Sequence, residues 1–223
     1  MKKILLAIEI LFTFLFFIFP PLISNQQQEN ILVTVVFSLN NLIAFCIAVF
    51  LFVFNNEIYK SNYKSKTISS PAGLIKNHGY SLIAFGTLIL IAGFIQLCVY
   101  LFCEDIELIK HPAINWPSSF FEFFGFLAAI TSSVFVEEVI YRFIFVDLLK
   151  EVTGKKLNIL WEFLSICLFA FAHKYLGFPA VINAFFCGIV LRILFIRTKS
   201  IWNCYFVHLI FNLLNFILLF LLK

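Results

Sequence analysis

Seven long apolar segments, separated by short polar stretches, constrain this chain more than any other feature of its sequence. They cover approximately residues 4–23, 31–54, 80–102, 118–146, 157–173, 176–196 and 200–222. A helix needs about 20 apolar residues to cross a bilayer, and each segment is near that length. With 62% hydrophobic and only 13% charged residues, the chain is too apolar for a water-soluble domain. The sequence therefore predicts an all-α fold: a polytopic transmembrane helix bundle of about seven spans, forming one integral membrane domain over residues 1–223.

The distribution of Lys and Arg over the loops predicts the orientation of these spans. Alternate loops together carry 12 of these residues, counting Arg192 with the last of them, whereas the other loops carry 3. By the positive-inside rule, the N-terminus is expected in the cytoplasm and the C-terminus outside a cell membrane. The acidic loop 103–117 and the polar segment 24–30 suit the outer face. Because the positive charge follows this topological pattern, nucleic acid is not expected as a partner.

Ionisable residues interrupt the fourth apolar segment. An ionisable side chain at the centre of a membrane helix costs roughly 2.5–3.5 kcal/mol on insertion scales and marks a functional site by default. Glu138 and Arg142 are four residues apart, so they share a helix face and are expected to pair. Glu137 points about 100° away from that face. It has no partner in its own helix, and we expect it to meet another helix or water.

Polar side chains in two later spans are candidates to meet Glu137. His173 ends the fifth segment, and His208 and Asn212 share one face of the seventh. Taken singly, a membrane histidine more often makes an interhelical hydrogen bond, and a Glu–Arg pair is usually structural. The combination of an unpaired Glu, two histidines and an amide within membrane spans favours a catalytic site.

These residues form three ordered motifs: Glu137-Glu138-x-x-x-Arg142, Phe169-x-x-x-His173 and His208-x-x-x-Asn212. The series resembles the signature of the CPBP (Abi) family of intramembrane proteases, which includes the type II CAAX prenyl endopeptidases. The resemblance covers about residues 118–222, the expected protease-like core. It implies an endopeptidase that hydrolyses a peptide bond in a membrane-associated protein or peptide, in contact with the lipid bilayer.

Amide hydrolysis needs a water molecule, a base and donors for the developing oxyanion, and the motif residues suit these roles. Glu137 is expected to act as the base, with His173 holding the same water. His208 and Asn212 are the expected oxyanion donors. Glu138 and Arg142 are expected to fix the orientation of the helix that carries Glu137. Zinc bound by Glu137, His173 and His208 is an alternative, because zinc takes such ligands. The metal-free scheme, with no cofactor, is favoured here.

Two other functions fit the same residues. The chain would be a non-catalytic membrane binding or immunity protein if the motif residues served packing alone. It would be a proton-coupled transporter if Glu, Arg and His relayed protons across the bilayer. The transporter is disfavoured because the sequence has no internal repeat and no matching pair of interrupted helices.

Overall fold

The computed structural model describes residues 2–23, 33–34, 38–63, 71–102, 114–154 and 157–221, and these residues are almost entirely helical. Segment 24–30 and residues 103–113 of the acidic loop lie outside this part of the chain. The α-helices are α1 (Lys2–Thr13), α2 (Phe19–Ile23), α3 (Leu39–Phe54), α4 (Asn56–Tyr63), α5 (Pro71–Phe102), α6 (Phe120–Glu137), α7 (Phe145–Thr153), α8 (Asn158–Phe171), α9 (Phe178–Thr198) and α10 (Ile201–Leu221). The π-helices η1 (Phe14–Ile18) and η4 (Glu138–Ile144), the 3-10 helix η6 (Lys174–Leu176) and one parallel pair of two-residue strands, β1 (Val33–Thr34) and β2 (Ile114–Asn115), complete the described elements.

Most of the predicted spans are present as continuous apolar helices. Among the described residues, six stretches are long and apolar enough to cross a membrane: Lys3–Ile23, Ile75–Phe102, Phe120–Thr153, Asn158–Leu176, Phe178–Thr198 and Ile201–Leu221. The remaining predicted span, residues 31–54, corresponds to α3, which is a shorter apolar helix of 16 residues. The prediction of a polytopic helical bundle is thereby confirmed, and the chain is a multi-pass membrane protein.

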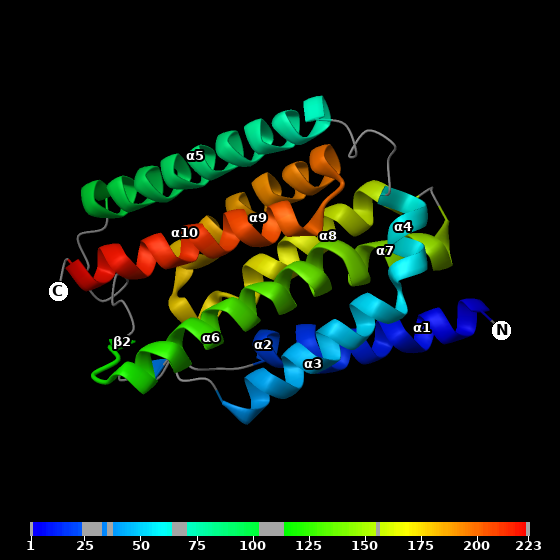
Figure 1. The fold of residues 1–223 in the computed structure, drawn as a ribbon, viewed down its shortest axis with the longest axis horizontal. Helices are drawn as coiled ribbons and strands as arrows, with labels where there is room; N and C mark the ends of the chain where they lie inside the picture. The colour runs from blue at the N-terminus through cyan, green and yellow to red at the C-terminus, as the bar shows by residue number, and fades with distance from the viewer. Residues whose placement is uncertain are drawn as a thin grey trace.

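The spans run up and down along one common direction. In Figure 1, successive spans alternate in direction, and the two ends of the chain lie at opposite ends of the bundle. Helix α5 packs on α9, α9 on α8, α1 on α7, and α3 on α6. Helices that are far apart in the sequence are therefore in contact. The N-terminal third of the chain is part of the same bundle as the helices that carry the three motifs.

The stretch Phe120–Thr153 lies at the centre of the bundle. Many of its side chains are buried, whereas most of the side chains of Ile75–Phe102, such as Leu90 and Phe94, lie on the surface of the bundle. This stretch is too long for one straight span, and the structure divides it into α6, η4 and α7. All seven residues of η4 are buried. A π-helical turn often marks a functional site, because its wider turn realigns the side chains that follow.

Helix α4 lies at the same end of the bundle as the N-terminus (Figure 1). The hydroxyl of Tyr59 donates to the carbonyl of Lys199 at 3.2 Å and accepts from the backbone N–H of Ile201 at 3.1 Å. Lys199 has a left-handed backbone (φ 55°) and ends α9, so this contact fixes the turn into α10. Burial raises the pKa of Tyr59, which keeps the phenol protonated and able to donate.

Candidate active site

Glu137 is the last residue of α6, and its carboxylate faces a cavity of about 230 Å³. The cavity walls come from η1 and α2, from the start of α3, from α6 and η4, and from the α8–η6 connection. The Glu137 side chain is 28% exposed, yet its Oε2 is buried and makes no hydrogen bond to any described residue. The rest of the carboxylate lines the cavity, where it can accept a hydrogen bond from a water or a substrate.

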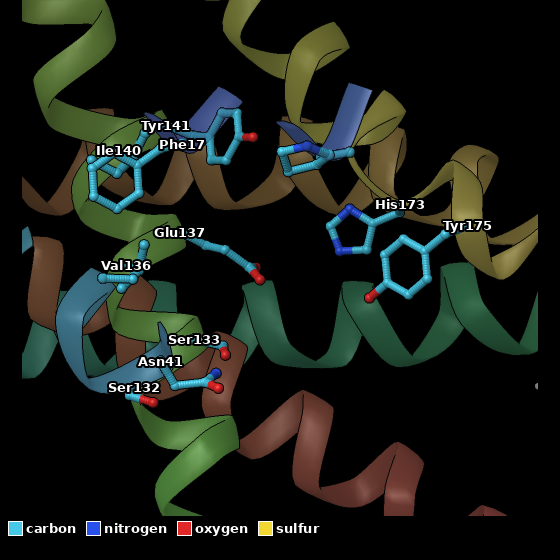
Figure 2. Close-up of a pocket in the computed structure, with 13 residues that line it drawn as sticks. Phe17, Asn41, Ser132, Ser133, Val136, Glu137, Ile140, Tyr141, His173 and Tyr175 are labelled. Carbon is cyan, nitrogen blue, oxygen red and sulfur yellow. The ribbon is translucent and has the colours of Figure 1, made fainter. Parts of the chain in front are cut away.

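His173 faces the same cavity from the connection between α8 and η6. Its Nδ1 lies 2.8 Å from the carbonyl oxygen of Phe169. Because a carbonyl can only accept, Nδ1 carries the proton, and Nε2 of the neutral ring is an acceptor. Figure 2 shows the imidazole and the Glu137 carboxylate turned toward a common space. The two side chains therefore provide acceptors for both protons of one water molecule.

His208 lies on α10, close to both Glu137 and Glu138, and is 5% exposed. Its Nδ1 is 2.8 Å from Glu138 Oε1, and its Nε2 is 3.8 Å from Glu137 Oε2. With Glu138 ionised, Nδ1 donates to it, and the carboxylate fixes the ring so that Nε2 faces Glu137. Nε2 is then an acceptor in the neutral ring and a donor in the cation. The predicted role as an oxyanion donor through Nε2 thus requires the doubly protonated ring.

The Glu138–Arg142 pair expected from the sequence is present at the centre of the protein. Arg142 Nε lies 3.4 Å from Glu138 Oε2, and both side chains are 1% exposed. The Arg142 guanidinium also lies over the ring of Phe169, 4.3 Å from its centroid. That ring is 4.8 Å from the imidazole of His173 and 6.0 Å from that of His208, so the two imidazole centroids lie no more than 10.8 Å apart.

Of the four predicted catalytic residues, Glu137 and His173 line the cavity, whereas His208 and Asn212 do not. Asn212 is the less buried of these two. It lies on α10, one turn beyond His208, and is half-buried. It does not line the cavity, and its side chain makes no hydrogen bond within the described part of the chain. Its role as an oxyanion donor stays a prediction.

Polar residues that the sequence analysis did not single out also line the cavity, among them Asn41 on α3, Ser133 on α6 and Tyr175 on η6. Figure 2 shows their polar ends directed toward the space in front of the Glu137 carboxylate. Ser133 is one helical turn before Glu137, so helix periodicity alone would have found it. Tyr175 is two residues beyond His173, but no such signal marks Asn41, which lies about 100 residues from the motifs.

Arg192, counted above with the charges of a loop, is instead buried inside α9 at 3% exposure. It pairs with Glu162 of α8, its Nη2 lying 2.6 Å from Glu162 Oε1, and Lys150 of α7 pairs with the same carboxylate. Another of its guanidinium nitrogens donates to the carbonyl of Arg142 in η4. Arg192 was counted because it lies near the end of a span, and its partner on a neighbouring helix could not be detected from the sequence.

The described residues do not form a ready-made metal site. Among them, no group of three or more His, Cys, Asp and Glu side chains is arranged to hold a metal ion. Each histidine directs Nδ1 at a protein oxygen and keeps Nε2 free, as metal-ligating histidines commonly do. The alternative zinc ligands Glu137, His173 and His208 nevertheless do not form such a group as they are placed, so they do not fit a metal ion in this arrangement.

Comparison with known proteins identifies the part of the chain that carries the site. Residues 118–214 match the family model described as "Type II CAAX prenyl endopeptidase Rce1-like". The matched region contains all three motifs, and the resemblance found in the sequence is confirmed. This is a family of proteases, so the match supports peptide hydrolysis at the level of the family. Neither the curated proteins nor the solved structures gave a match to the chain.

Proposed function

We propose that this chain, whose residues 118–214 match the Rce1-like type II CAAX prenyl endopeptidases, hydrolyses a peptide bond of a membrane-associated protein or peptide with a water activated by Glu137. The observation that carries the proposal is that the partly exposed Glu137 carboxylate and the His173 imidazole line the same cavity from two different elements, α6 and the α8–η6 connection. A carboxylate that reaches such a cavity can take up a proton from a water bound there.

The proposed catalytic cycle begins with Glu137 and His173, the two predicted residues that line the cavity. A water hydrogen-bonded to Glu137 and to Nε2 of His173 gives one proton to Glu137 as its oxygen attacks the carbonyl carbon of the substrate. The resulting oxyanion accepts hydrogen bonds from His208, in its doubly protonated form, and from Asn212. Each such donor is worth about 2.7–4 kcal/mol of transition-state stabilisation. Glu137 then returns its proton to the amine that leaves as the C–N bond breaks.

Glu138 and Arg142 act in this scheme by positioning other groups. Glu138 holds Nδ1 of His208, which directs Nε2 at Glu137. Arg142 balances the charge of Glu138 and packs against Phe169, whose ring contacts both histidines. A buried ion pair is weak evidence for stability in itself. Its value here is that one ion pair and one aromatic ring orient the histidines relative to Glu137.

The cavity lies toward the end of the bundle opposite the N-terminus. Its walls include the C-terminal ends of the first span and of α8, and the first turn of α3. With the N-terminus in the cytoplasm, as we propose from the loop charges, this end is the outer one. We therefore propose that substrates are cleaved in the outer half of the membrane.

Cleavage by the purified protein in proteoliposomes tests the proposed function. Two quenched fluorogenic peptides would serve as probes, one ending in a farnesylated CAAX sequence and the other its unlipidated counterpart. We expect cleavage of at least one of them by the wild-type protein. Glu137→Gln should be folded and inactive, since the amide retains the shape of the side chain and cannot take up a proton.

Glu122→Gln is the matched control, because Glu122 is on the same helix but is exposed at its N-terminal end. It should keep full activity. Activity that survives chelators supports the metal-free scheme, whereas zinc that is lost together with activity and restores it on re-addition contradicts that scheme. Equal cleavage by wild type and Glu137→Gln contradicts the proposed base. Proton flux without cleavage would indicate the transporter, and binding of the peptides without cleavage would indicate a non-catalytic binding protein.

A further inference from the structure

The amide of Asn41 is held in a defined orientation at the start of α3. Ser38 is the N-cap residue, and its hydroxyl accepts from the backbone N–H of Asn41 at 3.3 Å. In return, Asn41 Oδ1 accepts from the backbone N–H of Ser38 at 3.2 Å and from its hydroxyl. Since a backbone N–H can only donate, the oxygen of the Asn41 amide must be the atom that faces Ser38. This capping box therefore fixes which end of the amide is free.

The free end of that amide is its NH2 group, and the side chain lines the cavity with Glu137, Ser133 and His173. The Asn41 NH2 group donates no hydrogen bond to any described residue. In Figure 2 the polar end of the Asn41 side chain points into the space in front of the Glu137 carboxylate. A donor with a fixed orientation thus faces the place where, in the proposed reaction, the substrate lies.

A peptide in such a cavity needs donors of this kind. Away from water, each carbonyl oxygen of its backbone must be paired, because leaving it unpaired costs several kcal/mol. Glu137 and Nε2 of His173 are acceptors, so they cannot pair with a carbonyl. The described cavity wall has amide or hydroxyl donors on Asn41, Ser132, Ser133, Tyr141 and Tyr175. The hydroxyl of Ser132 already donates to the carbonyl of Ala129, and among the other four only the Asn41 side chain is oriented by hydrogen bonds to a second described residue.

We infer that Asn41 binds the substrate by donating from its NH2 group to a backbone carbonyl beside the scissile bond. The inference rests on the proposed function and extends it to a helix outside the matched residues 118–214. It gives the N-terminal spans a part in recognition in addition to their part in the bundle. The bond is to the peptide backbone, so it helps to bind peptides of different sequence and does not select among side chains.

Asn41→Asp tests this role sharply, because a carboxylate can accept both hydrogen bonds from Ser38 and has no donor to offer. Loss of one neutral hydrogen bond that is made equally in the ground state and the transition state should raise KM about two- to tenfold, with kcat unchanged. Asn40→Asp is the matched control. It adds the same charge at the neighbouring exposed position, outside the cavity lining, and should leave both constants unchanged.

A binding measurement separates failure of this inference from failure of the proposed function. Binding of the two probe peptides would be measured by fluorescence anisotropy on Glu137→Gln and on Glu137→Gln with Asn41→Asp. The second variant should bind about two- to tenfold more weakly, whether or not the wild-type protein cleaves the probes. Equal affinities, a KM effect equally large in Asn40→Asp, or no binding of either probe would overturn the role of Asn41.

Discussion

At the scale of single residues, the proposed chemistry depends on Glu138, whose two carboxylate oxygens have different partners. One accepts from His208 and the other faces Arg142, and all three side chains are buried. Glu138→Gln would leave Arg142 as an uncompensated buried charge. We expect it to lower the free energy of unfolding by about 3–5 kcal/mol. Denaturant unfolding of the protein in detergent micelles measures this change.

The comparison for that prediction is Glu57→Gln. Glu57 also pairs with a basic residue, Lys60, but its side chain is 87% exposed. Exposed pairs contribute less than about 1 kcal/mol, so this variant should unfold like the wild type. A loss of stability in Glu138→Gln no larger than that in Glu57→Gln would show that the buried pair is not needed for folding.

The same residues show what the sequence could and could not predict. Two carboxylates and an arginine in an apolar helix are conspicuous, so Glu137, Glu138 and Arg142 were predictable from local spacing. The orientation of His208 was not, because it depends on a hydrogen bond between α10 and η4, about 70 residues apart. Asn41 was not predictable either: an amide at a helix N-terminus looks like an ordinary cap until the fold places it in the cavity.

At the scale of secondary-structure elements, the apolar segments predicted the helices well, but not their internal irregularities. Periodicity assumes an α-helix throughout, whereas residues 138–144 form a π-helix. That segment follows Glu137 directly and contains both residues of the buried pair. Length alone indicated that the fourth segment could not be one straight helix. The position of the break could not be found this way, since it depends on packing between η4 and its neighbours, including the hydrogen bond from Arg192 to the Arg142 carbonyl.

The connection between α8 and α9 gives a prediction at the same scale. Gly177 is the N-cap residue of α9 and has φ 95° and ψ 169°, a conformation that side chains with a Cβ rarely adopt. Gly177→Ala should therefore destabilise the protein by about 1–3 kcal/mol. It should also lower activity, because the preceding turn carries His173 and Tyr175. Thermal unfolding and the fluorogenic peptide assay measure the two effects.

Gly86→Ala provides the contrast within a helix. Gly86 lies in α5, where an added Cβ would meet no atom within 4 Å. Alanine is favoured over glycine inside a helix by about 1 kcal/mol, so this variant should be equally or more stable and fully active. If both substitutions had the same effect, the positive φ of Gly177 would not be what positions the turn.

At the scale of the whole molecule, the arrangement of the spans puts the two termini on opposite sides of the membrane, and which side is outside stays a prediction from the loop charges. The two termini lie at opposite ends of the bundle, as an odd number of crossings requires (Figure 1). Cysteine labelling in intact cells tests which end is outside. With the native cysteines replaced, Ser118→Cys should react with a membrane-impermeant maleimide, because it precedes α6 at the outer end. Glu57→Cys, in α4, should react only after the cells are permeabilised. The opposite pattern would reverse the orientation and place the cavity in the cytoplasmic half of the membrane.

The most direct test of the central claim is the source of the oxygen in the cleaved product. The probe peptides would be incubated with the protein in water enriched in ¹⁸O, and the fragments analysed by mass spectrometry. If Glu137 activates water to attack a peptide carbonyl, the new C-terminal carboxylate gains one ¹⁸O atom in a single turnover. Under the same conditions Glu137→Gln should form no such fragment. Cleavage without ¹⁸O in the new carboxylate, or equal ¹⁸O-labelled cleavage by Glu137→Gln, would contradict the account.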